Sequence, residues 1–237
     1  MRKEDTSAGH NQHHHSHSHK SCVSSVPIFN HLEEEQMNEI TKTIHSVNYK
    51  KGETVYHAGE QSDSLFIVNK GKIRVYRLSE SGKEQLVRIL MPGDFTGELA
   101  LFTETTYVSF AEAMAETSVC RIKRTDFQNL LLQYPTISLK VLTEFSKRLA
   151  QSEKQSMRFA TEKVETRIAL FLAECFDSEN QTDTIELPMS KKDLASYLGT
   201  TPETISRKFT ELEAQGLIEQ KTHKLIKVLD LDGLLLN

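Results

Sequence analysis

The stretch LPMSKKDLASYLGTTPETISRKFTELEAQGLI, residues 187–218, contains two short helical patterns on either side of a tight turn. Apolar residues at helical spacing indicate a first helix that begins after Ser190 and ends at Gly199. Pro202 suits the first turn of a second helix, because its missing N–H would be unpaired there. Gly216 ends that second helix. The sequence therefore predicts a helix–turn–helix.

The second helix places its apolar residues on one side and Glu203, Ser206 and Arg207 on the other. A two-stranded wing is predicted for residues 217–230, with its turn at Thr222–His223. A helix of this size fits the DNA major groove. Seven cations and five acids between residues 191 and 227 give a local positive excess in a chain of net charge −4. We therefore expect a winged helix–turn–helix that binds double-stranded DNA; the alternative is a protein-interaction module with a solvated charged face.

The composition limits the function classes. No apolar run approaches the roughly 18 residues of a membrane-spanning helix, and the polar N-terminus lacks a secretory apolar region. Three cysteines spread from Cys22 to Cys175 do not form the framework of a secreted protein. No nucleophile–base signature, phosphate-binding loop or zinc-hydrolase helix occurs. These features predict a cytoplasmic, non-enzymatic protein that has no membrane partner.

The region from Tyr49 to about Lys123 has the pattern of short strands. Runs rich in Val, Ile, Phe and Tyr are separated by glycines. Residues 70–78, KGKIRVYRL, alternate so that Ile73 and Val75 share one face. Short strands at near-regular spacing, without long helices between them, predict a β-roll or sandwich.

Helical patterns follow this region. TDFQNLLLQYP, residues 125–135, predicts a helix with Thr125 as N-cap, and Pro135 is expected to end it. The next helix carries an apolar stripe that either packs on the β-domain or forms the seam of a parallel dimer. The stripe consists of Ile137, Val141, Leu142, Phe145 and Leu149.

The predicted class is α+β. Residues 1–24 form a polar, His-rich arm that we expect to be disordered. Residues 25–135 form a β-roll of jelly-roll type with flanking helices, and residues 136–163 form the long helix. Residues 164–237 form the winged helix–turn–helix.

A β-roll, a long helix and a winged helix–turn–helix in this order resemble the CRP/FNR family of bacterial transcription regulators. GDFTGELALF (93–102) is similar to the family's roll motif, and TPETISRKFTELEAQGLI (201–218) to its recognition helix. The resemblance implies a homodimer that binds DNA and contacts RNA polymerase. Glu203, Ser206 and Arg207 fit the E-x-x-S-R pattern of the FNR branch, whose members read TTGA-type half-sites. The other residues expected at the DNA are Ser190, Lys191, Thr201 and Lys208.

The resemblance also bears on the signal. Cyclic AMP binding in the CRP branch uses an Arg-Ser pair, where this chain has Val108 and Ser109, although Glu98 remains. A neutral side chain does not compensate a buried phosphate, so cyclic AMP is not expected. A [4Fe–4S] cluster of FNR type needs four thiolates, and only Cys22 and Cys120 occupy such positions. That cluster is therefore not expected either.

Cys22 and Cys120 match the pair kept by the FNR-like proteins of lactic acid bacteria, in which an arm–roll disulfide is the proposed switch. The resemblance therefore implies control by thiol redox. The alternative is that Cys120, which alternates with Ile122 on one strand face, only fills the core.

The histidines of the arm are candidate metal ligands. Imidazole and thiolate form a zinc- or copper-type ligand set, here His13, His15, His17, His19 and Cys22. A solvated tail with adventitious metal affinity and a cloning remnant are the alternatives. The resulting hypothesis is a redox-controlled regulator with metal as a modulator. A regulator controlled by a cyclic nucleotide or other small ligand, and one that binds metal without a disulfide switch, are the competing hypotheses.

Overall fold

The computed structural model describes residues 23–24, 26–176 and 183–236. The chain divides into two compact units: Met1–Ile73 with Leu90–Phe145, and Arg74–Ile89 with Ser146–Asn237. The division falls inside the long helix and separates residues 74–89 from the rest of the predicted roll. Among the described helices, not one combines the length and apolar content that crossing a bilayer would require.

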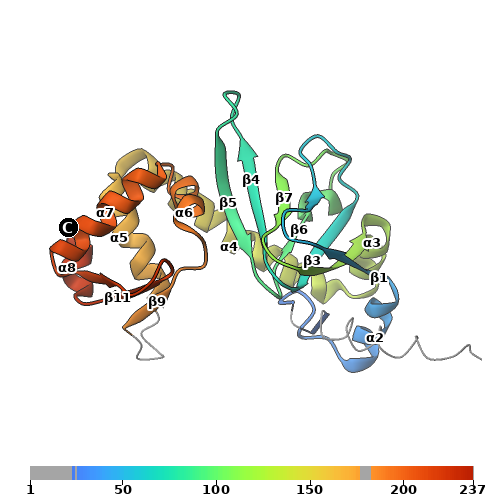
Figure 1. The fold of residues 1–237 in the computed structure, drawn as a ribbon. Helices are drawn as coiled ribbons and strands as arrows, with labels where there is room; N and C mark the ends of the chain where they lie inside the picture. The colour runs from blue at the N-terminus through green and yellow to red at the C-terminus, as the bar shows by residue number, and fades with distance from the viewer. Residues whose placement is uncertain (1–22, 25, 177–182, 237) are drawn as a thin grey trace, which may run out of the picture. The chain divides into compact units, whose positions relative to one another are not determined.

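Two four-stranded sheets form the β-region, which confirms the predicted roll (Figure 1). The first has the order β1-β8-β3-β6 and consists of β1 (Ile44–Tyr49), β8 (Thr117–Lys123), β3 (Ser64–Lys70) and β6 (Phe95–Thr96). The second has the order β2-β7-β4-β5 and consists of β2 (Thr54–Tyr56), β7 (Phe110–Ala113), β4 (Ile73–Leu78) and β5 (Glu84–Leu90). Strand β8 pairs antiparallel with both β1 and β3.

A tight approach of the chain explains one glycine of the motif at residues 93–102. Gly97 precedes the short 3-10 helix η1 (Glu98–Leu101) and has a φ of 81°. A Cβ at this position would collide with the carbonyl oxygen of Ser64 on β3. Only glycine therefore allows η1 to lie this close to the strand.

The core of the first unit includes side chains of the first sheet and of the helices α2 (Glu34–Lys42) and α3 (Arg124–Gln133). Phe29 and Phe127 are fully buried, with ring centroids 6.2 Å apart. The burial of each such side chain stabilises the fold by about 1.5–3 kcal/mol. The prediction that Thr125 caps α3 is wrong: the helix begins at Arg124, and Lys123 is its N-cap.

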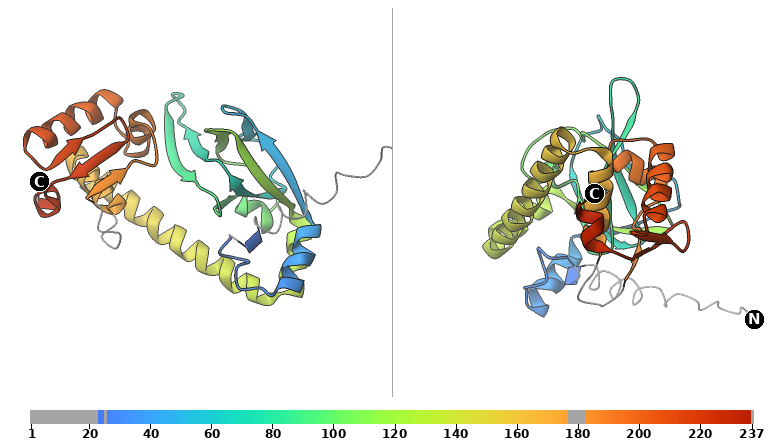
Figure 2. Two further views of the ribbon diagram at one scale, coloured as in Figure 1. Left: turned by 60° about the horizontal axis from the view of Figure 1, so that its bottom comes forward. Right: turned by 90° about the vertical axis from the view of Figure 1, so that its left-hand side faces the viewer.

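Pro135 opens a helix instead of only ending one. Helix α4 runs over Pro135–Thr161 as one continuous element (Figure 2). Proline is tolerated at a helix start because its ring fixes a helical φ and its missing N–H has no partner to lose there. Only Tyr134 therefore separates α3 from α4.

The apolar stripe of α4 divides between the two predicted roles. Ile137 and Val141 are buried in the core of the first unit, and Phe145 packs against it. Leu142 and Leu149 are exposed, at 59% and 61%. Ile137, Val141 and Phe145 therefore pack within the chain. Leu142 and Leu149 lie on the surface of the helix.

The second unit contains the predicted helix–turn–helix. Its elements are α5 (Val164–Cys175), β9 (Thr184–Glu186), α6 (Lys191–Tyr197), α7 (Pro202–Ala214), β10 (Ile218–Gln220), β11 (Leu225–Val228) and α8 (Leu231–Leu236). The wing is a sheet of three strands, in the order β10-β11-β9, where the sequence predicted two. Strand β9 joins because Ile185 lies opposite Ile226 and both side chains are buried.

Cys175 ends α5 and is partly buried against the core of this unit, where it acts as a packing residue. Burial, with a smaller contribution from Glu174, raises the pKa of its thiol to about 11. The thiolate, which is the reactive form, is therefore scarce at neutral pH.

Candidate nucleic-acid interface

The N-cap of helix α7 is Thr201. The Oγ1 of Thr201 accepts a hydrogen bond from the backbone N–H of Thr204 at 3.2 Å, and Pro202 is the first helical residue. Such a cap stabilises a helix by about 1 kcal/mol. The predicted start of this helix is confirmed.

The two faces of α7 are also as predicted. Ile205, Phe209 and Leu212 are buried in the core of the second unit. Glu203, Ser206 and Arg207 are all exposed. The core therefore holds one side of the helix and leaves an acid, a hydroxyl and a guanidinium on the other.

The charged groups on the exposed side are available to a ligand. The side chain of Arg207 is 68% exposed, and its Nε lies 3.8 Å from Oε1 of Glu211 one turn later. An exposed pair of this kind holds its partners only weakly. A hydrogen bond from its own backbone N–H, and a second from Thr201, lower the pKa of Glu203. Its carboxylate is therefore ionised at neutral pH and can only accept hydrogen bonds.

Ser190 and Lys191 have structural contacts at the start of α6. The Oγ of Ser190 accepts from the N–H of Asp193 at 3.1 Å and donates to its Oδ2 at 2.6 Å. The Nζ of Lys191 donates to Oε1 of Gln220 at 2.7 Å and lies 5.0 Å from the ring centroid of Phe209. Burial lowers the pKa of this ammonium group. Lys191 therefore joins α6 to the wing and to α7.

Lys208 is also held inside the unit. Its Nζ lies 2.7 Å from Oε1 of Glu165 on α5 and 2.6 Å from Oε2 of Glu211, and its side chain is 18% exposed. The two carboxylates, Glu165 first, raise the pKa of this lysine. Of the predicted interface residues, Thr201, Glu203, Ser206 and Arg207 thus share the open surface, whereas Ser190, Lys191 and Lys208 serve contacts within the unit.

Two further exposed cations belong to the same unit. Lys192 on α6 and Lys224 in the wing turn are both exposed. Both are among the seven cations between residues 191 and 227, but the sequence does not show which of these cations face solvent.

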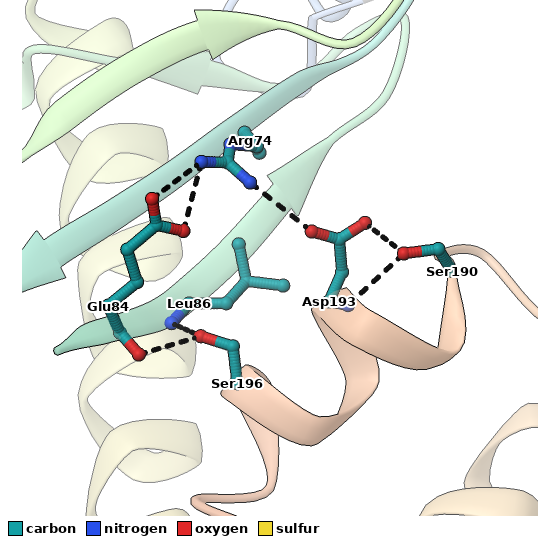
Figure 3. Close-up of polar contacts among 6 residues, drawn as sticks. All are labelled: Arg74, Glu84, Leu86, Ser190, Asp193 and Ser196. Carbon is teal, nitrogen blue, oxygen red and sulfur yellow. Dashed lines mark hydrogen bonds and ion pairs between the residues drawn. The ribbon is translucent and has the colours of Figure 1, made fainter. Parts of the chain in front are cut away.

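A polar network that the sequence did not predict joins the β4–β5 hairpin to α6 (Figure 3). The guanidinium of Arg74 on β4 donates to both carboxylate oxygens of Glu84 on β5, at 3.0 and 3.2 Å. It also donates to Oδ1 of Asp193 on α6 at 3.4 Å. Arg74 thus joins the hairpin to the same aspartate that Ser190 contacts (Figure 3).

Backbone groups extend this network. The Oγ of Ser196 accepts from the N–H of Leu86 at 2.8 Å and donates to the carbonyl oxygen of Glu84 at 3.0 Å (Figure 3). Gln85 donates to the carbonyl oxygen of Tyr197 at 3.3 Å. The residues of these pairs are 110–119 apart in the chain, so no local sequence signal could have found them.

The described residues that the sequence suggests for signal detection all belong to the first unit. Cys120 is fully buried on β8, opposite Ser46 of β1 and Ile67 of β3. Val108 is 50% exposed, and Glu98 is the first residue of η1. In the part of the chain that the structure describes, no group of three or more His, Cys, Asp or Glu could hold a metal ion. The predicted ligands His13, His15, His17, His19 and Cys22 lie outside the described residues.

Comparison with known proteins identifies the family. Residues 46–134 match the family model of the cyclic nucleotide-binding domain, and residues 166–236 match that of the Crp-like helix-turn-helix domain. The probable transcriptional regulator flp of Lacticaseibacillus casei is 36% identical over 214 residues, 90% of this chain and 96% of that protein. This chain is a CRP/FNR-family transcription regulator.

Further relatives agree with this assignment. The transcriptional activator protein FnrA of Stutzerimonas stutzeri is 30% identical to the regulator, covering 78% of it and 77% of FnrA. The structure of FixK2 from Bradyrhizobium japonicum is 26% identical with a TM-score of 0.70, covering 81% of the regulator and 95% of FixK2. A CooA mutant from Carboxydothermus hydrogenoformans, 24% identical over 83% of the regulator and 88% of CooA with a TM-score of 0.73, shows the same fold. The regulator is a DNA-binding protein.

Proposed function

We propose that this regulator is a homodimer that reads a TTGA-type palindrome under the control of the redox state of Cys22 and Cys120. The observation that carries the DNA-reading part is the exposed side of α7, where Glu203, Ser206 and Arg207 lie together opposite a buried apolar side. The guanidinium of Arg207 has the geometry to donate to O6 and N7 of guanine, and Glu203 can accept from a cytosine amine.

The dimer is supported by the surface of α4. Leu139, Leu142 and Leu149 are 67%, 59% and 61% exposed on a helix whose Ile137 and Val141 are buried in the core of the first unit. Their positions follow the three- and seven-residue spacing of a coiled-coil seam. Two copies joined along this seam would present two α7 helices about 34 Å apart, the repeat of the major groove. RNA polymerase is the further partner that we propose for the DNA-bound dimer.

The thiol control is supported by the state of Cys120. Its side chain is fully buried on strand β8, whereas Cys175 is a free thiol outside the proposed pair. Cys22 lies outside the described residues, but its neighbour Val23 is fully buried in the same core cluster as Cys120. A bond that links the arm to the roll becomes a switch when the reducing cytosol opens it, and cytosolic disulfides are usually of this transient kind.

The hairpin–α6 network is the route that we propose for the signal inside the protein. β4 and β5 belong to a sheet of the roll, and their side chains and backbone hold α6 through Asp193 and Ser196. A change in the hairpin would therefore act directly on the helix that precedes the recognition helix.

We propose no iron–sulfur cluster and no cyclic nucleotide as the signal. The chain has three cysteines, fewer than the four thiolates of a cluster, and Cys175 lies in α5. Val108 offers no charge to a phosphate. Zinc or copper on the His-rich arm remains part of the proposal as a modulator.

The test is binding of the full-length protein to a TTGA palindrome, with and without reductant, in the wild type and in Cys22→Ser. We expect the two redox conditions to give different affinities in the wild type and the same affinity in the variant. Cys175→Ser, which removes a free thiol outside the proposed pair, is the matched control and should keep the wild-type difference. Equal affinity under all conditions would exclude the thiol switch, and no preference for the palindrome over random DNA would exclude the proposed target.

A further inference from the structure

A cavity of about 400 Å³ lies in the second unit, between the last turns of α4, the middle of α5 and the C-terminal end of α6. Its aromatic lining residues are Phe159, Phe171 and Tyr197. Pockets of this volume with apolar walls and a few polar groups are typical of small-molecule sites. The exposed residues of α7 do not line it, so the cavity is separate from the DNA interface.

The cavity carries an excess of positive charge. Its described lining residues include three cations, Lys154, Arg158 and Arg167, and a single carboxylate, Glu174. Lys154 and Arg158 share one oxygen of that carboxylate, at 2.8 and 2.7 Å. Burial would raise the pKa of Glu174, but the hydrogen bonds from Arg158 and Lys154 outweigh it and lower the pKa. The carboxylate is therefore ionised, and two of the three cations are paired with it.

Arg167 differs from the other two lining cations in its contacts. Its guanidinium carbon lies 5.1 Å from the ring centroid of Phe159, and its Nε is buried without a hydrogen-bond partner. Within the described part of the chain, no carboxylate forms an ion pair with it. A buried donor without an acceptor destabilises the protein. An oxyanion in the cavity would supply the negative charge that this guanidinium lacks.

We propose that this cavity binds a small organic anion that consists of a flat apolar ring bearing a carboxylate or phosphate group. The guanidinium of Arg167 matches the paired oxygens of either group. Phe159, Phe171 and Tyr197 provide the apolar wall for the ring. Nothing in the proposed redox control requires this site, so the two proposals stand or fall separately.

An occupant would touch two functional elements together. Tyr197 and Leu198, at the end of α6, line the cavity with the last turns of α4. The carbonyl oxygen of Tyr197 already accepts a hydrogen bond from Gln155 of α4 at 3.4 Å. Binding therefore links the long helix to the helix that precedes α7.

The test is calorimetry on the full-length protein, with probes that distinguish the contribution of the anionic group to binding from that of the aromatic ring. Benzoate and phenyl phosphate carry both features, acetate and inorganic phosphate carry the charge, and benzyl alcohol carries the ring. We expect benzoate or phenyl phosphate to bind at least about tenfold more tightly than the single-feature probes. The tighter of these two identifies the acid group. If neither exceeds acetate, phosphate and benzyl alcohol, the proposal is overturned.

Variants locate the binding. Arg167→Gln should weaken binding of the preferred probe by about 10- to 100-fold, because it removes a charged hydrogen-bond donor. Arg77→Gln removes the same charge from an exposed position on β4 and should leave the affinity unchanged. Ala150→Phe fills the cavity from an exposed helix position and keeps every cation, so it tests the site even if Arg167→Gln does not fold. Full affinity in Ala150→Phe overturns the assignment.

Discussion

The contact between Arg74 and Asp193 makes a quantitative prediction about how firmly the β4–β5 hairpin holds α6. The two side chains are 15% and 13% exposed, and the bond between them is 3.4 Å long. At an effective dielectric constant of 20, unit charges about 4 Å apart attract by about 4 kcal/mol, and desolvation offsets much of this. We expect a coupling energy of about 1–2 kcal/mol, above the value of exposed pairs and below that of buried ones.

The two single substitutions should have unequal effects. Arg74→Met leaves both Glu84 and Asp193 without their shared cation, and we expect it to cost about 2 kcal/mol. Asp193→Asn leaves Arg74 in its two-bond contact with Glu84, so it should cost about 1 kcal/mol. In Arg74→Met, Asp193 keeps its hydrogen bonds with Ser190, and these limit the loss of stability.

The assay is hydrogen exchange of the Leu86 amide, which donates to Ser196 and opens when the hairpin leaves α6. The two single variants and the double variant form a thermodynamic cycle, whose coupling corresponds to a factor of about 5–30 in the opening constant. Arg77→Met, at an exposed position of the same strand, is the matched control. Additive effects, within about 0.3 kcal/mol, would refute the reasoning.

Three further predictions concern the interface, the dimer and pH. Arg207→Ala should remove preference at one G·C pair, a loss of about 1–3 kcal/mol in competition binding at fixed salt, and unchanged preference would contradict its role. Leu142→Glu should shift the protein from dimer to monomer in sedimentation, whereas Leu132→Glu, 82% exposed on α3, should not. Lys208 lowers the pKa of Glu165 from 4.5, and Glu165 raises that of Lys208 from 10.5. Their contact therefore stabilises between these values and is lost as pH falls through the lowered carboxyl pKa or rises through the raised ammonium pKa. Thermal unfolding of Lys208→Met should differ from wild type only within that window.

The recognition helix illustrates what local sequence can fix. Thr201 and Pro202 define its start, and the spacing of Ile205, Phe209 and Leu212 defines its buried side. Capping, ring geometry and helical periodicity all act within a turn or two, so they can be read from neighbouring residues. The same local signals misled at α3, where Lys123 and not Thr125 precedes the helix.

The partners of the charged residues around the interface cannot be read from the local sequence. Lys208 and Arg207 are adjacent in the chain, yet one is held by Glu165 and the other is exposed. Sequence spacing could suggest the partner Glu211, three residues away, but not the partner on α5. Which of these two cations is exposed to a ligand is therefore decided by packing.

The sequence by itself determined the order of the elements, the two helices of the DNA-binding motif and the side of α7 that faces outward. Only the tertiary structure decided that a third strand joins the wing, that Arg74 reaches Asp193, and that a cationic cavity forms between α4, α5 and α6. The reason is the separation of the contacting residues along the chain. A helix and its faces follow from contacts between residues three or four apart. A contact between residues 119 apart exists only when the rest of the chain has brought them together.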